Sequence, residues 1–364
     1  MNAPVPLARH SLTDASEDRR DAASHLPTPE ALHRTLPLEP ALARRIEGQR
    51  QAIREILAGR DDRLLVVVGP CSIHDPEAAL EYARRLAALA PHIEDRILPV
   101  MRVYVEKPRT TVGWKGLAYD PDLDGRGDLA RGLELSRSLM REIAGLGLPM
   151  ATELLQPMLA PYLDDLLAWV AIGARTTESQ LHREMASGLE AVVGFKNATS
   201  GDLQVAIDAM RAAAHPHQHF AMAADGRPMV RETPGNPHTH VVLRGGHGEP
   251  NYRAPQVAAS RRALEAAGLT PRLMVDCSHA NARKDHRRQS EVMLDVLGQR
   301  LAGDSALVGL MLESHIHEGK QPLAPGKLRY GVSVTDACIG WETTEHLLTT
   351  AAERLRETGI DERV

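Results

Sequence analysis

Eight short runs of apolar, strand-forming residues follow one another from residue 64 onward, and each is followed by a helical or loop stretch. The runs are LLVVVG at 64, ILPVMRVYV at 97, PMATEL at 149, AWVAIGA at 168, VVGF at 192, HVVLRG at 240, LMVDCS at 273 and LVGLMLES at 307. Near-continuous apolar runs of this length are typical of buried parallel strands. Eight such strands close a barrel, so we predict an α/β fold, the (β/α)8 or TIM barrel.

Each run ends in a polar or ionisable side chain, at the position where barrel enzymes keep their chemistry. An open, doubly wound sheet could also alternate strands with helices, but eight consecutive polar strand ends favour the closed barrel. In chain order these residues are Cys71, Arg102, Glu153, Arg175, Lys196, Arg244, His279 and Glu313.

Two segments fall outside the barrel pattern. Residues 1–38 are polar without a sustained apolar period and predict an arm that packs poorly by itself, whereas 41–58 has the spacing of a helix laid against the main domain. Residues 219–233 hold two extended runs around Asp225-Gly226, which predicts a hairpin inserted between strands five and six. We therefore expect a regulatory or oligomerisation part at 1–60 and a catalytic barrel at 61–364, with the hairpin insertion near 218–234. The histidines that flank the hairpin are interpreted as a solvated patch; they are His215, His217, His219, His238 and His240.

Charge and composition exclude several classes of function. The 364 residues include 43 Lys plus Arg against 48 Asp plus Glu, so the net charge of −5 argues against nucleic acid as a partner. The longest apolar run, 166–174, is too short to cross a bilayer, and the polar N-terminus lacks the apolar stretch of a signal peptide. The 3 cysteines do not suggest a disulfide framework. We expect a cytoplasmic protein that binds neither nucleic acid nor a membrane.

Four potential metal ligands lie at the predicted mouth of the barrel. Cys71, His279 and Glu313 end strands, and Asp336 follows the last strand. A donor set of one sulfur, one nitrogen and two carboxylates suits Mn, Fe, Co, Zn or Cu. Taken singly, each residue is more often structural, as a buried thiol, a hydrogen-bonded histidine or a capping carboxylate. The four together favour a metal site.

Four fixed cations share the same mouth: Arg102, Arg175, Lys196 and Arg244. Crowding of positive charge is unfavourable unless anions bind there, and guanidinium groups hold carboxylate or phosphate oxygens bidentately. This pattern predicts a small polyanion such as a phosphorylated carboxylic acid. The run EKPRTTVGWKG at 106–116 predicts a second phosphate site, with a solvent-facing basic loop as the alternative.

Several longer motifs point to one family: GPCSIHDP at 69, MRVYVEKPRTTVGWKG at 101, GARTTES at 173, GFKN at 194, LRGG at 243, DCSHAN at 276, ESH at 313 and TDACIGWE at 335. From about residue 40 onward the chain resembles class I 3-deoxy-D-arabino-heptulosonate 7-phosphate (DAHP) synthase. The resemblance implies a transferase that condenses phosphoenolpyruvate with D-erythrose 4-phosphate and water, in a metal-dependent aldol-type reaction. The products are DAHP and phosphate, at the first step of the shikimate pathway.

The resemblance also assigns roles to residues of this chain. It implies one divalent metal, with Mn2+ expected and Fe2+, Co2+, Zn2+ or Cu2+ also compatible, held by Cys71, His279, Glu313 and Asp336. The implied phosphoenolpyruvate contacts are Arg102, Lys107, Ala174, Arg175, Lys196 and Arg244. The implied erythrose 4-phosphate contacts are Lys107, Pro108, Arg109, Thr110 and Asp336.

Two side chains are candidates for proton transfer. We hypothesise that Lys107 donates a proton to the new alkoxide and that neighbouring cations lower its pKa. Unlike arginine, lysine can titrate, which suits it to this role. Glu153, at the third strand end, is our candidate to orient the attacking water.

Regulation and assembly follow from the same resemblance. In this family the arm and the hairpin commonly build a remote site for an aromatic amino acid, and the sequence leaves open whether Tyr, Trp, Phe or none binds here. Glu190 stands where a small residue is often found. A homodimer or homotetramer is expected.

Two other functions are alternatives to the synthase. One is a synthase that joins phosphoenolpyruvate to arabinose 5-phosphate, against which the KPRTTVGWKG loop argues. The other is a non-catalytic, effector-binding partner of another shikimate enzyme, against which the intact set of ligands and cations argues.

Overall fold

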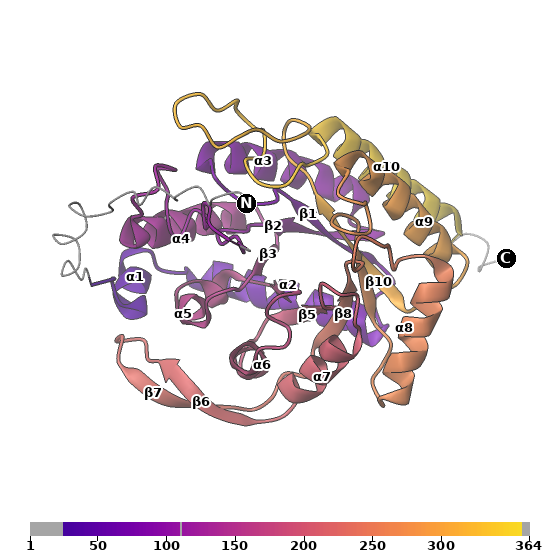
Figure 1. Cartoon of the computed structure of the whole chain (residues 1–364), viewed down its shortest axis with the longest axis horizontal. Coiled ribbons are helices and arrows are strands. Elements are labelled where there is room, and N and C mark those ends of the chain that lie inside the picture. Colours follow the sequence, from indigo (N-terminus) through magenta and orange to yellow (C-terminus); the bar gives the residue numbers. More distant parts are fainter. Residues whose placement is uncertain (1–24, 110, 359–364) are drawn as a thin grey trace, which may run out of the picture.

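The computed structural model describes residues 25–109 and 111–358, and it confirms the predicted barrel. All eight apolar runs form parallel strands of one closed sheet in the order β1-β10-β9-β8-β5-β4-β3-β2, with the helices outside (Figure 1). The strands are β1 (Leu64–Gly69), β2 (Ile97–Arg102), β3 (Met150–Glu153), β4 (Trp169–Ile172), β5 (Val192–Lys196), β8 (Thr239–Leu243), β9 (Leu273–Asp276) and β10 (Leu307–Glu313).

Helices connect successive strands, as parallel pairing requires. Their starts carry sequence signals: α3, for example, begins at Pro76, and the Asp75 side chain accepts hydrogen bonds from the Glu77 and Ala78 N–H groups. The outer helices are α3 (Pro76–Ile93), α4 (Leu129–Gly145), α5 (Ala160–Leu163), α6 (Gln180–Ser187), α7 (Gln204–Ala213), α8 (Ala254–Ala266), α9 (Gln289–Leu301) and α10 (Trp341–Thr358), with 3-10 turns η1 (Pro157–Leu159), η2 (Asp164–Leu166) and η3 (His286–Arg288).

The predicted helix at 41–58 is confirmed as α2 (Pro40–Ala58), and it covers the N-terminal end of the barrel. Its Ile53, Ile56 and Leu57 pack in one cluster with side chains of the barrel interior such as Val67 and Trp169. Because the interior is filled by side chains and closed at this end, the barrel is a packed core rather than a pore. Its chemistry is therefore confined to the carboxyl ends of the strands.

The inserted hairpin is confirmed as β6 (His217–Met222) and β7 (Pro228–Thr233), which pair antiparallel between β5 and β8. Within the predicted arm, α1 (Pro29–Thr35) packs on the main domain, and its Leu32 is buried against the barrel's outer core. The Glu30 N–H donates to the Ala224 carbonyl in the hairpin turn. Residues 1–24 lie outside the described residues, and the division at residue 60 stays a prediction.

One histidine of the predicted solvated patch lies inside the barrel. His240 is fully buried on β8, and its Nε2 accepts a hydrogen bond of 2.9 Å from the Trp169 indole N–H. Burial lowers the pKa of His240 to about 4. The prediction is wrong for this residue because β8 begins at Thr239, which puts His240 on the same inward face as the interior residue Val242.

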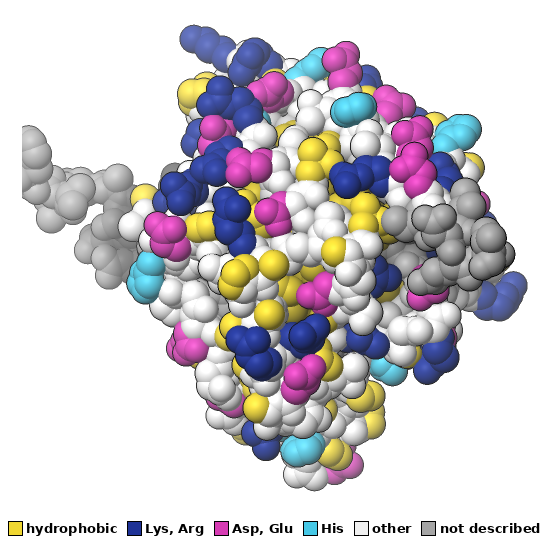
Figure 2. Space-filling model, turned by 90° about the vertical axis from the view of Figure 1, so that its right-hand side faces the viewer, with side chains coloured by type: hydrophobic (Ala, Val, Ile, Leu, Met, Phe, Trp, Pro, Cys, Tyr) yellow, Lys and Arg dark blue, Asp and Glu magenta, His cyan; other side chains and the backbone are white. Residues whose placement is uncertain are grey.

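The surface carries mixed charge on the face seen in Figure 2, where acidic and basic side chains are interspersed. Among the described residues, no helix combines the length and the apolar character needed to span a membrane.

Candidate active site

Three potential metal ligands converge at the carboxyl end of the barrel. Gly69 of β1 is paired in register with Glu313 of β10, which brings Cys71 beside Glu313. Asp336 returns to the same place because the Ile339 N–H donates to the Glu313 carbonyl at 3.0 Å. The Cys71 sulfur and a carboxylate oxygen from each of Glu313 and Asp336 lie within 4.8 Å of one another. Cys71 and Glu313 are buried, and burial, together with the charge of Glu313, raises the pKa of the Cys71 thiol to about 12.

The Lys107 ammonium occupies the edge of this cluster. Its Nζ lies 2.8 Å from the Cys71 sulfur and 3.0 Å from Asp336 Oδ2. Burial works to lower the pKa of Lys107, but its interactions with Cys71 and Asp336 outweigh this effect and raise the pKa. The expectation of a lowered pKa is wrong because Lys107 faces the Asp336 carboxylate and the Cys71 sulfur rather than the neighbouring cations.

Arg102 lies beneath the cluster and is 1% exposed. Its Nη2 donates to Glu313 Oε1 at 3.3 Å, and the guanidinium stacks 3.9 Å over the Tyr104 ring. Within the described part of the chain, its buried Nη1 has no hydrogen-bond partner. A buried donor without a partner is unfavourable, so Nη1 is available to an anion.

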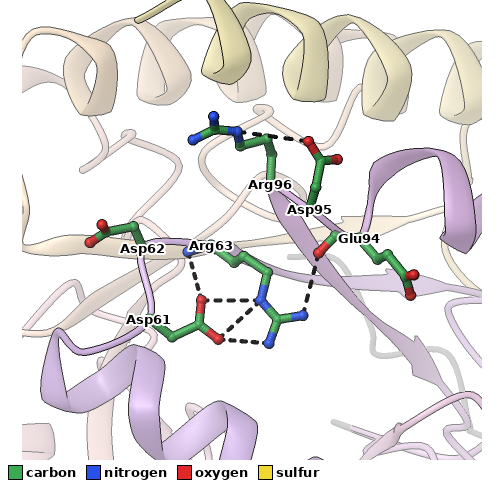
Figure 3. A pocket seen from close by; sticks show the side chains of 6 residues that line it. All are labelled: Asp61, Asp62, Arg63, Glu94, Asp95 and Arg96. Atoms are coloured by element: carbon green, nitrogen blue, oxygen red, sulfur yellow. Dashed lines mark hydrogen bonds and ion pairs between the residues drawn. The ribbon is translucent and has the colours of Figure 1, made fainter. Parts of the chain in front are cut away.

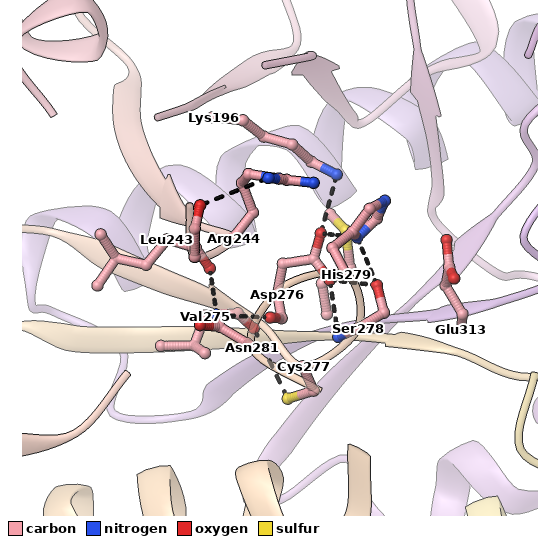
Figure 4. Close-up of polar contacts among 12 residues, drawn as sticks. Lys196, Leu243, Arg244, Val275, Asp276, Cys277, Ser278, His279, Asn281 and Glu313 are labelled. Carbon is pink, nitrogen blue, oxygen red and sulfur yellow. Dashed lines mark hydrogen bonds and ion pairs between the residues drawn. The ribbon is translucent and has the colours of Figure 1, made fainter. Parts of the chain in front are cut away.

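Asp276, which the sequence analysis missed, joins the metal-ligand candidate His279 to the cation Lys196 (Figure 4). Its Oδ2 lies 2.9 Å from both Lys196 Nζ and His279 Nδ1, and its Oδ1 accepts from the Ser278 hydroxyl at 2.6 Å. Burial works to raise the pKa of Asp276, but the charges of His279 and Lys196 lower it well below its usual value. The sequence feature that could have identified Asp276 is its position as a carboxylate at the end of the apolar run LMVD.

His279 does not belong to the converging group of Cys71, Glu313 and Asp336. Its backbone has a φ of 54°, and its Nδ1 faces Asp276 and the Ser278 hydroxyl. A metal-binding histidine commonly engages a carboxylate through the nitrogen that does not bind the metal. His279 has this arrangement, with Nε2 left for a metal.

The remaining predicted cations lie around the same mouth. Burial lowers the pKa of Arg244, with Asp276 acting against that shift and the charge of nearby Arg175 adding to it. Arg175 itself is exposed, and its neighbour Ala174 is half-buried. The Arg244 N–H is fixed at 2.9 Å from Asn197 Oδ1, directly after Lys196.

The Glu153 carboxylate is buried against the turn that carries Ala174 and Arg175. A Cβ added at Gly173 would lie 2.0 Å from Glu153 Oε1. Any side chain at position 173 would therefore clash with the Glu153 carboxylate.

The loop after β2 is held by hydrogen bonds of its own. The Lys107 N–H donates to the Lys115 carbonyl at 2.8 Å, and the Arg109 Nε–H donates to the Trp114 carbonyl at 2.7 Å. Pro108 is half-buried and Arg109 is exposed, whereas Thr110 lies outside the described residues. The loop thus holds the Lys107 ammonium at the barrel mouth.

Glu106 is a second buried carboxylate that the sequence analysis missed. It accepts hydrogen bonds from the Tyr119 hydroxyl and the Leu155 N–H, both at 3.0 Å, and from the Gln156 N–H at 3.4 Å. Burial raises the pKa of Glu106 to about 7 although these hydrogen bonds work to lower it. This carboxylate ties the loop after β2 to the loop after β3.

A groove of about 310 Å³ lies beside the N-terminal ends of β1 and β2, away from these residues (Figure 3). Both of its arginines are paired with carboxylates of the same groove, Arg63 with Asp61 and Arg96 with Asp95. It brings together none of the predicted ligands.

Comparison with known proteins gives one consistent result. A family described as the DAHP synthetase I family matches residues 41–349. The Tyr-sensitive phospho-2-dehydro-3-deoxyheptonate aldolase of Salmonella typhimurium is 56% identical over 325 residues, which is 89% of this chain and 91% of the relative. The Trp-sensitive aldolase of Enterobacter agglomerans is 50% identical over 94% of this chain and 98% of its own. The solved structure of the Francisella tularensis aldolase has a TM-score of 0.90 and 43% identity, and the match covers 92% of this chain and 98% of that one.

Proposed function

Because the chain belongs to the DAHP synthetase I family, we propose that it condenses phosphoenolpyruvate with erythrose 4-phosphate and water to give DAHP and phosphate. The observation that carries this proposal is the meeting of a sulfur and carboxylate donor cluster with buried cations at one barrel mouth. The names of the relatives support a catalyst and give no support to a non-catalytic partner of another enzyme.

The donor cluster fits a divalent metal. A cation, the Lys107 ammonium, already lies against both Cys71 and Asp336, so the place suits positive charge. We infer that Cys71, His279, Glu313 and Asp336 hold the ion, with Mn2+ expected and Fe2+, Co2+, Zn2+ or Cu2+ compatible with the donor set. When bound, such an ion supplies Lewis-acid polarisation of a substrate oxygen.

The cations position the first substrate. Four basic residues at the mouth offer charge-assisted hydrogen bonds to the carboxylate and phosphate of phosphoenolpyruvate. They are Arg102, Lys196, Arg244 and Arg175. The unpartnered Nη1 of Arg102 gains an acceptor when this anion binds. Backbone groups at Ala174 complete this subsite in our proposal.

The second substrate lies toward the loop after β2. The proposed contacts of erythrose 4-phosphate are Lys107, Pro108, Arg109, Thr110 and Asp336. Lys107 reaches the donor cluster and belongs to both subsites, so it stays our candidate to deliver the proton of the new hydroxyl. Glu153 stays our candidate to orient water.

Regulation is proposed from the packing of the arm. The arm is joined by hydrogen bonds to the hairpin turn and to α5, among them that from the Tyr162 hydroxyl to the Pro27 carbonyl at 2.7 Å. Relatives named Tyr-sensitive and Trp-sensitive suggest an aromatic amino acid as feedback inhibitor here. A cytoplasmic homodimer or homotetramer is part of the same proposal.

The test is phosphate release from phosphoenolpyruvate, with and without erythrose 4-phosphate, after treatment with EDTA and again after addition of Mn2+. We expect release that needs both the second substrate and the metal. Release with arabinose 5-phosphate but not erythrose 4-phosphate would assign the other synthase. An absence of release with either aldose and every compatible metal would overturn the proposal.

A further inference from the structure

A groove of about 500 Å³ lies at the end of the barrel opposite the candidate active site. Its walls come from the C-terminal end of α2, from α7, from the start of β8 and from the segment after α8 (Figure 1). Leu57, which helps to close the barrel at this end, forms part of its wall. The groove is therefore separate from the cluster around Cys71.

The charged side chains that line the groove are all basic. Arg54, Arg60 and Arg272 line it together with His238, and none of the lining residues is Asp or Glu. Arg60 pairs with Glu55 and Arg54 pairs with Glu47. The buried Nε of Arg54 has no hydrogen-bond partner in the described ranges 25–109 and 111–358.

Arg272 is the least compensated of the three cations. Its Nε and Nη1 donate to the backbone carbonyls of Leu57 and Pro271. Among the described residues it forms no ion pair with a carboxylate, and the positive charge of Arg300 acts on it as well. A partly buried guanidinium without a counter-charge is unfavourable, and an anion would relieve it.

Part of the remaining wall is apolar. Pro237 is exposed and Leu269 is half-buried, and Leu57 and Met210 are almost fully buried. The other polar residues of the wall are Gln51, Thr239 and Thr270. Inorganic phosphate would leave this apolar surface in contact with water. An apolar body beside a charged head would cover it.

We propose that this groove binds a small organic carboxylate, with the carboxylate on Arg272 and Arg54 and an apolar body against Leu269 and Pro237. The inference does not depend on the proposed catalytic function, because it uses no residue of the candidate active site.

The experiment is titration of the full chain with 4-fluorobenzoate, followed by fluorine NMR of the ligand. Arg272→Gln removes the charge, and we expect it to weaken binding roughly tenfold or more. Ala214→Phe fills the groove while the arginines stay in place, and we expect a similar loss. Circular dichroism and thermal unfolding establish that each variant is folded.

Two variants serve as controls. Arg262→Gln removes an exposed arginine of α8 outside the groove, and Arg175→Gln removes a cation from the other end of the barrel; both should bind as the parent chain does. If Arg175→Gln alone loses binding, the ligand occupies the active site and the proposal is wrong. Equal competition by inorganic phosphate and by neutral 4-fluorobenzamide would also overturn it, since neither has both a charged head and an apolar body.

Discussion

Three of the positive charges at the barrel mouth are matched to a negative or polarisable group. Arg102 pairs with Glu313, Lys196 with Asp276, and Lys107 with Asp336 and the Cys71 sulfur. Because the first two pairs are buried, removal of one partner leaves a charge that water cannot solvate. Single substitutions here should therefore change ligand affinity more than substitutions elsewhere on the surface.

Cys71→Ser tests the sulfur ligand. The hydroxyl is a poorer ligand than a thiolate for the borderline metals expected here, so Mn2+ affinity should fall by roughly tenfold or more. Equilibrium dialysis of the EDTA-treated protein measures this affinity. Cys277→Ser is the matched control, because Cys277 is equally buried but its sulfur lies toward the Val275 carbonyl. Equal losses in both variants would show that Cys71 is not specifically a ligand.

Asp276→Asn tests the carboxylate that joins His279 to Lys196. The amide keeps the shape but removes the charge, so we expect metal affinity to fall roughly 10- to 100-fold and KM for phosphoenolpyruvate to rise. Dialysis and steady-state kinetics measure the two effects separately. The half-buried Asp285, which pairs with Arg287 nearby, gives the control Asp285→Asn. Unchanged metal affinity in Asp276→Asn would contradict the role.

At the scale of elements, the apolar runs predicted all eight strands because a strand buried on both faces leaves a nearly continuous apolar segment. The Asp225-Gly226 turn predicted the hairpin, and the spacing of Ile46, Ile53 and Leu57 predicted α2. The 7-residue α1 was missed because so short a helix shows no period. Its place is fixed by the burial of Leu32 and by its contact with the hairpin.

Glu106→Gln tests the tie between the loops after β2 and β3. The folded-state pKa of Glu106, about 7, lies above its usual 4.5, so between these values the folded chain binds more protons than the unfolded chain. The stability of the parent chain should therefore fall relative to the variant as pH rises from about 4.5 to 7, by up to about 3 kcal/mol.

Urea unfolding of parent and variant at several pH values measures the difference. Glu134→Gln, on the exposed face of α4, is the control and should show no such trend. A constant difference between Glu106→Gln and the parent across this range would mean that Glu106 does not carry the shift.

At the scale of the whole molecule, the arm joins parts of the chain that are far apart in sequence. Tyr162 anchors the arm at Pro27, and Glu30 contacts the hairpin turn at Ala224. Glu190, whose side chain was unexpected for the family, pairs with Arg50 and so holds α2 at the closed end of the barrel.

Tyr162→Phe tests whether the arm carries the proposed inhibition. Loss of one hydrogen bond should raise the concentration of aromatic amino acid needed for half-inhibition roughly twofold to tenfold, with basal phosphate release unchanged. Tyr330→Phe also loses a hydroxyl contact, to Glu81, and should have no effect. Unchanged inhibition in Tyr162→Phe would show that this contact of the arm does not contribute to inhibition.

The amino-acid sequence by itself determined the barrel, the hairpin, α2 and the residue types gathered at the mouth, because buried strands and helices require a regular pattern of apolar residues. Only the tertiary structure decided the surroundings of single charges. It placed Lys107 against Cys71 and Asp336, put Asp276 between Lys196 and His279, and turned His240 into the barrel interior. These environments depend on distances between residues that are up to 265 positions apart, as for Cys71 and Asp336. Electrostatic energies follow such distances and the local burial, neither of which a linear pattern records.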